Sequence, residues 1–274
     1  MAYLKICEQT LGSQAEKAKR QANAGDPGPL ELLRAVQDKT SSEVDTAHHI
    51  GAVMTTEELI SAYSIDGIFP VRVAPRFGIW QGYKMVINKD GLESHLKDEK
   101  GNEIQKLRCI DDFKVNGVNA QTMLADKLFL PNFELPARIG AEFFNKMGND
   151  APELILGLDD LFAAYRRVPN ADSKRFGIVG IYNLDSSSVD WHEVLGLPFG
   201  LASAPVIFNR RPAAICAIAR VYCGVAVDAF FDDFICVDKA DAPITEEKIS
   251  QAERPANAPG PAARNGHWTR LHPS

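Results

Sequence analysis

The chain has 274 residues, of which 45% are hydrophobic and 24% charged, and its formal net charge is −6 at pH 7. A chain of this length can bury a sizeable core in one or two domains, and its composition is that of ordinary globular proteins. The acidic balance excludes a protein that is basic as a whole, so a polyanionic partner would have to meet a local patch of Lys and Arg.

The cysteines and the apolar runs bear on where the protein works. The five cysteines form no CxxC pair, no histidine is spaced to complete a zinc site, and their number is odd. Without a secretory signal, this pattern predicts a reduced, intracellular setting, cytoplasmic or nuclear. No apolar run approaches the roughly 18 residues of a membrane span, so we expect no transmembrane segment and no membrane partner.

Residues 1–70 are expected to form an N-terminal segment of helices and linkers. Leu11 to Ala24 is rich in Ala, Lys and Gln and predicts a helix, and Pro29 to Val36 begins a second one after a turn rich in Gly and Pro. Thr55 and Glu58 have the spacing of a capping box, which predicts a further helix start.

A basic strand is predicted from Lys106 onward. Because side chains alternate along a strand, the stretch divides into two faces, with Lys106, Arg108 and Ile110 on one and Leu107, Cys109 and Asp111 on the other. Two cations that point the same way are suited to holding an anionic group, and a solvated edge strand has the same pattern. Both interpretations remain open on these residues alone. Farther along, Gln121 to Leu130 predicts a helix in a connector that ends before Pro131.

Two carboxylates follow the next predicted strand. The apolar run from Leu154 to Leu158 predicts a buried strand, and Asp159 and Asp160 come directly after it. An Asp at this place either presents its carboxylate at the rim of a sheet or caps the helical turn that follows.

Two strands and a glycine loop come next. Lys174 to Tyr182 and His192 to Leu197 predict the strands, which are joined through the turn-forming residues Asn183 to Ser188. In the stretch from Leu197 to Phe208, Gly200 would let the backbone approach a flat ligand closely, just before a helix begins.

The stretch from Val225 to Val237 predicts a hairpin. Two adjacent carboxylates, Asp232 and Asp233, lie between two apolar runs that favour β-structure, so we expect them at the turn. Asp is common in solvent-exposed turns, so an ordinary turn and a metal site are both compatible with this pattern.

Four of these stretches together resemble a known family. KLRCIDDFKVNGVN resembles the basic fingers motif of reverse transcriptases, and three later stretches resemble their palm motifs in the same order. The LPFG-x-x-x-AP-x-x-F form is similar to that of retrotransposon enzymes. The stretches are Lys106 to Asn119, DLFAAYRRVP (Asp160 to Pro169), LPFGLASAPVIFNR (Leu197 to Arg210) and FFDDF (Phe230 to Phe234).

The resemblance implies an α/β (α+β) fold with a polymerase palm, in which a mainly antiparallel sheet is backed by helices. It implies a partial, fingers-like region over residues 71–150 and a palm over residues 151–240. Residues 241–274 are expected to hold a short helix, Ile244 to Arg254, and a disordered tail rich in Pro and Ala, with no recognisable thumb.

The activity implied by the resemblance is that of an RNA-directed DNA polymerase, a nucleotidyltransferase that extends a primer on an RNA or DNA template with deoxynucleoside triphosphates. Such transfer uses two Mg²⁺ ions about 3.5–4 Å apart, for which Mn²⁺ can substitute, and carboxylates are suitable ligands. By resemblance, Asp160 and Asp232 are the main ligands, Asp233 is a weaker one, and the carbonyl of Leu161 completes a site. Asp159 competes with Asp160, but only Asp160 keeps the D-L-x-x-A-Y spacing.

The family pattern also implies substrate-binding residues. Lys106 and Arg108 would hold the incoming triphosphate. Tyr165 matches an aromatic steric gate that rejects a ribose 2′-hydroxyl, although a buried aromatic on a helix would have the same spacing. Phe199 and Gly200 would line the nucleotide pocket.

Three departures from the family pattern keep alternatives open. Phe230 stands where the family usually has Tyr, and Pro212 is expected to kink or break the helix that begins near Pro205. The chain also resembles the family only up to the palm, so a catalytically silent, truncated retroelement remnant is the main alternative. An RNA-dependent RNA polymerase would share the acids, but Tyr165 and the LPFGLASAP block argue against it. The sequence carries no signal for an oligomeric state.

Overall fold

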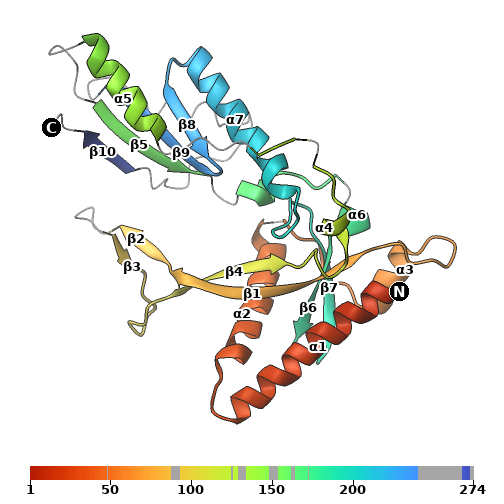
Figure 1. Cartoon of the computed structure of the whole chain (residues 1–274). Coiled ribbons are helices and arrows are strands. Elements are labelled where there is room, and N and C mark those ends of the chain that lie inside the picture. Colours follow the sequence, from red (N-terminus) through yellow and green to blue (C-terminus); the bar gives the residue numbers. More distant parts are fainter. Residues whose placement is uncertain are drawn as a thin grey trace. The chain divides into compact units, whose positions relative to one another are not determined.

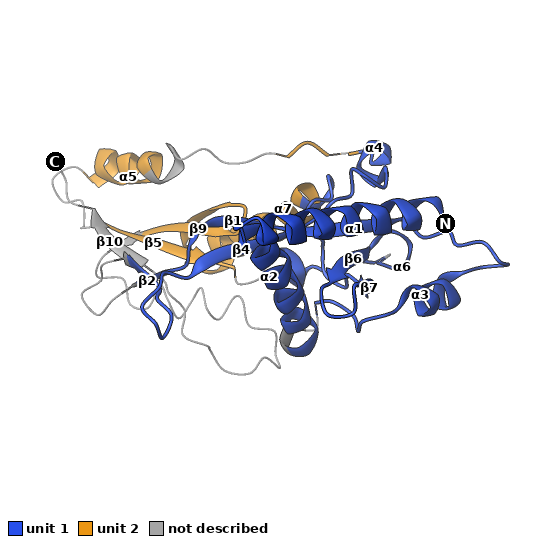
Figure 2. Ribbon diagram, turned by 90° about the horizontal axis from the view of Figure 1, so that it is seen from below, with its two compact units in different colours: residues 1–123, 165–204 blue, residues 124–164, 205–274 orange. Residues whose placement is uncertain are grey.

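The computed structural model describes residues 1–47, 49–87, 93–124, 126–128, 134–147, 154–161, 164–171, 173–239 and 267–271 (Figure 1). The chain forms two compact units, which Figure 2 draws in two colours. Unit 1 comprises residues 1–123 and 165–204, and unit 2 comprises residues 124–164 and 205–274. Each unit combines helices with a four-stranded sheet, which confirms a mixed α/β fold.

Unit 1 is built on a mixed sheet with the strand order β4-β1-β6-β7. The pairing of β1 with β6 is parallel, and the two outer pairings are antiparallel. A separate two-stranded ribbon is formed by β2 and β3. The strands are β1 (Val73–Tyr83), β2 (Met85–Ile87), β3 (Glu93–His95), β4 (Gln105–Asp111), β6 (Ile178–Asn183) and β7 (Ser188–Glu193).

Three helices from the first 70 residues pack into unit 1. They are α1 (Ala2–Asn23), α2 (Gly28–Ser42), which continues into a π-helical turn (Glu43–Ala47), and α3 (Thr56–Tyr63). The buried residues of α1 recur every three or four positions, so one face of the helix joins the core with Val73, Ile178 and Trp191. At α3 the predicted capping box is confirmed, because the Thr55 hydroxyl accepts from the Glu58 N–H and the Glu58 carboxylate from the Thr55 N–H.

The helix predicted from Gln121 to Leu130 is wrong for the described part of that stretch. The short helix α4 (Val118–Gln121) lies mostly upstream, and Thr122 after it is extended. Met123 is 95% exposed, and residues 121–124 and 126–128, the described part of the stretch, include no buried side chain that could stabilise a helix. Unit 1 also contains α6 (Ser173–Phe176) and most of a 3₁₀ turn (Ala164–Arg167).

Unit 2 has an antiparallel sheet with the order β10-β5-β9-β8. One face of it is buried and carries Val227, Ala229, Phe234 and Cys236. Helix α5 lies against β9. The elements are α5 (Glu134–Met147), β5 (Leu154–Asp160), α7 (Ala204–Tyr222), β8 (Ala226–Phe230), β9 (Asp233–Lys239) and β10 (His267–Leu271).

Three details differ from the sequence-based expectations. Helix α7 does not end at Pro212, because Pro212 is buried on the same side as Phe208 and Cys216, and this packing offsets the backbone hydrogen bond that proline cannot make. Both strands around Asn183–Ser188 differ from their predicted bounds: the first begins only at Ile178, because Ser173–Phe176 form the helix α6, and the second runs from Ser188 to Glu193 instead of from His192 to Leu197. Strand β10 lies within the stretch expected to be a disordered tail and pairs with β5, whereas the helix expected at Ile244–Arg254 lies outside the described residues.

Cys7, Cys109, Cys216 and Cys223 are free thiols. No helix in the described ranges has the length and apolar character needed to cross a membrane.

Candidate active site

The predicted acidic hairpin is confirmed as the pair β8–β9. Phe230 pairs with Asp233, so only Phe231 and Asp232 form the connecting loop. Phe231 has a positive φ of 57°, a conformation that is unfavourable for a bulky residue and common for Gly. The turn that presents the two carboxylates is therefore strained.

Asp160 lies beside this turn, on the neighbouring strand β5. It pairs directly with Asp233, and the next backbone N–H, that of Leu161, donates to the carbonyl of Asp232 at 3.1 Å. Directly paired residues project to the same side of a sheet, so Asp160 and Asp233 share one face. This face is opposite to the one that carries the buried Phe234. It is open beside the acids, where Leu158 is 47% exposed, and is covered farther along, where Leu154 and Val237 are buried.

The register also separates Asp160 from its rival. Asp159 pairs with Phe234 and so belongs to the other face, where its carboxylate accepts from the Asp160 N–H at 3.0 Å. Of the two, only Asp160 therefore shares a face with Asp233.

Asp160 and Asp233 occupy directly opposite positions on paired strands. Like charges directly opposite each other on paired strands destabilise a sheet, by roughly 0.2–1 kcal/mol. The positive φ of Phe231 adds strain at the same place. Both features lie at the same end of the β8–β9 hairpin.

The donor set fits Mg²⁺ in its chemistry. Carboxylate and carbonyl oxygens are the ligands that this hard cation prefers, and Asp160, Asp232 and Asp233 lie on adjacent backbone segments. Within the described residues, however, no three Asp, Glu, His or Cys side chains lie close enough together to hold a metal ion. Mutual repulsion keeps neighbouring carboxylates apart, and a bound cation would offset that repulsion.

The predicted anion clamp lies on β4 in unit 1. Lys106 and Arg108 are exposed on one face, while Cys109 and Asp111 are buried on the other, as the alternation predicts. The two cations are therefore available to a ligand in solution.

The Phe199–Gly200 loop packs against the end of β4. The Asp111 N–H donates to the carbonyl of Phe199 at 2.9 Å. Gly200 has a φ of 101°, and a Cβ there would lie 2.1 Å from the carbonyl oxygen of Asp111. The predicted close approach at Gly200 is thus to the backbone of β4. The Phe199 ring lies 5.1 Å from the Tyr165 ring, centroid to centroid.

Beneath this loop, unit 1 buries a charge cluster that the sequence analysis missed. Arg76 donates from Nε to Asp111 at 2.7 Å and from Nη1 to Glu43 at 3.2 Å, and Arg166 Nη2 lies 3.5 Å from Asp111. Burial disfavours the charge of Arg76, but the carboxylates of Asp111 and Glu43 outweigh it and raise the pKa of the guanidinium. Burial, and then the neighbouring Arg76, lower the pKa of Arg166. The one available signal was the alternation that places Asp111 on the inner face of β4.

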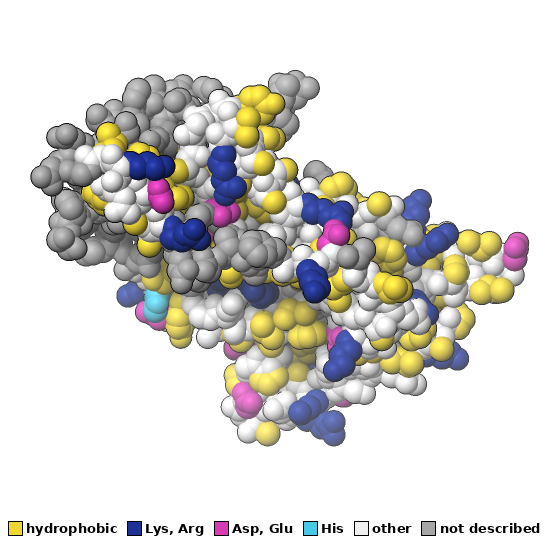
Figure 3. All heavy atoms as spheres, turned by 45° about the horizontal axis from the view of Figure 1, so that its top comes forward, with side chains coloured by type: hydrophobic (Ala, Val, Ile, Leu, Met, Phe, Trp, Pro, Cys, Tyr) yellow, Lys and Arg dark blue, Asp and Glu magenta, His cyan; other side chains and the backbone are white. Residues whose placement is uncertain are grey.

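The predicted site residues thus form two groups. Asp160, Leu161, Asp232 and Asp233 belong to unit 2, and Lys106, Arg108, Tyr165, Phe199 and Gly200 belong to unit 1. On the face drawn in Figure 3, the described Lys and Arg side chains lie singly or in small groups among hydrophobic and polar ones. Neither protein-family models nor curated proteins gave a match to this sequence.

Proposed function

We propose that the chain is an RNA-directed DNA polymerase domain of a retrotransposon-type element. The observation that carries the proposal is the strained β8–β9 turn, which holds Asp232 and Asp233 beside Asp160 on the adjacent strand. A fold tolerates strain and like-charge repulsion at one point when the groups there have a function. The order of the four sequence motifs supports the same function.

In this proposal Asp160 and Asp232 hold two Mg²⁺ ions, with Asp233 and the Leu161 carbonyl as additional oxygen ligands. The ions would activate the primer 3′-hydroxyl and neutralise charge on the triphosphate. Lys106 and Arg108 bind triphosphate oxygens from the exposed face of β4. Phe199 and Gly200 line the nucleotide pocket, and the Tyr165 ring beside Phe199 excludes a ribose 2′-hydroxyl.

Primer extension tests this function. On poly(rA) with an oligo(dT) primer, dTTP and Mg²⁺ or Mn²⁺, the chain should incorporate nucleotide, and Asp232→Asn/Asp233→Asn should reduce incorporation by about 10³-fold or more. Asp185→Asn is the matched control, because Asp185 also lies in a hairpin turn but binds Arg34. It should keep its activity.

The outcome separates the proposal from its main alternative. Absence of incorporation above the double variant, from protein that circular dichroism shows to be folded, would identify a catalytically silent remnant. Incorporation of UTP in preference to dTTP would instead identify an RNA polymerase.

A further inference from the structure

Arg166 occupies an unusual place for a cation. It follows Tyr165 in the 3₁₀ turn, and only 6% of its surface is exposed. Its Nη2 lies 3.5 Å from Asp111 Oδ2, and its guanidinium carbon lies 5.5 Å from the centre of the Phe199 ring. A guanidinium over an aromatic face is an attractive contact. The Arg166 side chain therefore contacts both Asp111, at the end of β4, and Phe199.

Asp111 connects these contacts. Its carboxylate binds Arg76 and Arg166, and its backbone N–H donates to the carbonyl of Phe199. Arg166 thus acts on Phe199 directly through the ring and indirectly through Asp111.

The backbone on the other side of Arg166 is equally constrained. A Cβ at Gly196 would lie 2.2 Å from the carbonyl oxygen of Arg166, and the Leu197 N–H donates to the carbonyl of Tyr165 at 3.2 Å. These backbone contacts therefore hold the segment that carries Tyr165 against the segment that leads into Phe199.

Packing alone does not explain a guanidinium here. Arg166 Nε and Nη1 are buried and have no hydrogen-bond partner in the part of the chain that the structure describes. Arg76, a second cation, belongs to the same cluster. A buried polar group with unsatisfied donors is costly, and an apolar side chain of similar size would fill the space at lower cost.

We propose that Arg166 is a positioning residue that fixes the Tyr165 ring relative to the Phe199 ring and so sets the discrimination between deoxyribose and ribose. This inference rests on the proposed function, because it assigns the Tyr165–Phe199 pair to a nucleotide pocket. Arg166 itself does not touch the substrate.

Arg166→Met tests the proposal, with Arg167→Met as the matched control because Arg167 is the exposed neighbour with the same charge. Steady-state primer extension gives kcat and KM for dTTP and for UTP. In Arg166→Met the dTTP-over-UTP preference should fall about tenfold, mainly through a lower KM for UTP, because a displaced Tyr165 ring no longer excludes the ribose 2′-hydroxyl. Arg167→Met should keep the wild-type preference.

Arg166→Lys is a second test variant, which is used if Arg166→Met does not fold. Lysine keeps the charge opposite Asp111 but lacks the planar group over Phe199, so its preference should fall in the same direction. An unchanged preference in a folded, active Arg166 variant overturns this inference and leaves the proposed function standing. A wild-type chain that neither incorporates dTTP nor binds it in preference to UTP overturns both.

Discussion

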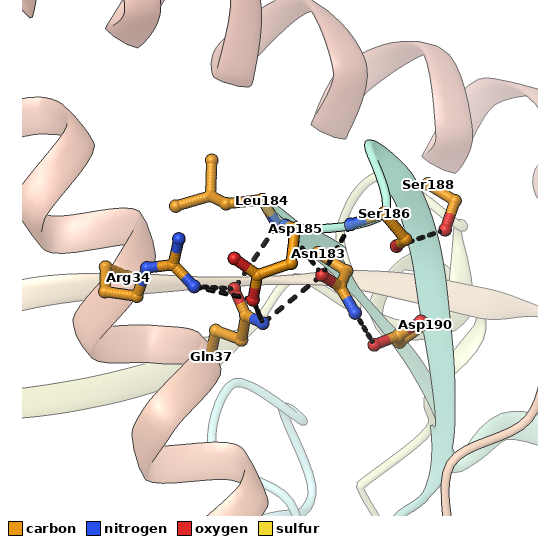
Figure 4. Close-up of polar contacts among 8 residues, drawn as sticks. All are labelled: Arg34, Gln37, Asn183, Leu184, Asp185, Ser186, Ser188 and Asp190. Carbon is orange, nitrogen blue, oxygen red and sulfur yellow. Dashed lines mark hydrogen bonds and ion pairs between the residues drawn. The ribbon is translucent and has the colours of Figure 1, made fainter.

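The hairpin between β6 and β7 and the hairpin between β8 and β9 both carry aspartate in their turns, but the surroundings of the carboxylates differ. In the first, Asp185 binds Arg34 and Gln37 of α2, and the Asn183 side chain accepts from two backbone N–H groups of the turn (Figure 4). In the second, Asp233 lies opposite another carboxylate. Both turns contain one non-glycine residue with positive φ, Ser187 in the first and the bulkier Phe231 in the second. The contrast distinguishes acids that stabilise a turn from acids that the fold tolerates.

Removing polar side chains should lower the free energy of unfolding more at the first hairpin than at the second. Asn183→Ala removes the acceptor for the Asp185 and Ser186 N–H groups and the donor to Asp190, at 2.9, 3.2 and 2.7 Å respectively. We expect a loss of about 2 kcal/mol in the free energy of unfolding, because three hydrogen bonds are lost, one of them the partly buried bond to Asp190. Urea unfolding followed by the fluorescence of the fully buried Trp191 on β7 measures it.

Ser186→Ala is the control for this measurement. The Ser186 hydroxyl forms a hydrogen bond with the hydroxyl of the exposed Ser188, so its loss should change stability by less than about 0.5 kcal/mol. Equal effects of the two substitutions would mean that side chains do not hold this turn, and the contrast between the hairpins would fail.

The second hairpin should respond to a divalent cation. At a free Mg²⁺ concentration ten times its dissociation constant, binding to the native state adds about 1.4 kcal/mol of stability. Hydrogen exchange of the β5 and β9 amides should slow accordingly, while exchange in β6 and β7 of the same sample stays unchanged. In Asp232→Asn/Asp233→Asn the Mg²⁺ effect should disappear. Equal protection in both hairpins would indicate a non-specific salt effect.

Local sequence patterns predicted several of the elements described above. Alternation along the chain assigned the faces of β4, and two apolar runs around Asp232–Asp233 predicted the second hairpin, because both signals depend only on near neighbours. The spacing argument for Asp160 has the same local origin. The mixed α/β class was implied by the family resemblance, which rests on four such local stretches.

Contacts between distant residues were beyond the sequence patterns. Asp111 is 35 residues from Arg76 and 55 from Arg166, and no periodicity links the three. The course of α7 through Pro212 depends on tertiary packing, which overrides the local preference of proline. The division into two units also has no local signature, since each unit is assembled from two separate stretches of chain.

The smallest predicted effect tests whether the acids of the second hairpin really oppose folding. Asp233→Asn removes one of two like charges on paired strands, so without Mg²⁺ it should raise the stability of β5 and β9 by about 0.5 kcal/mol, measured by hydrogen exchange. The gain should shrink in high salt, which screens the repulsion between exposed charges.

The control for this last measurement lies on the same sheet. Asp228 on β8 lies 3.2 Å from Arg220, so Asp228→Asn removes an attraction and should lower stability. If the two substitutions change stability in opposite directions, Asp228 stabilises the sheet and Asp233 destabilises it. If Asp233→Asn instead lowers stability, the Asp233 carboxylate stabilises the sheet, and repulsion between Asp160 and Asp233 does not destabilise this hairpin.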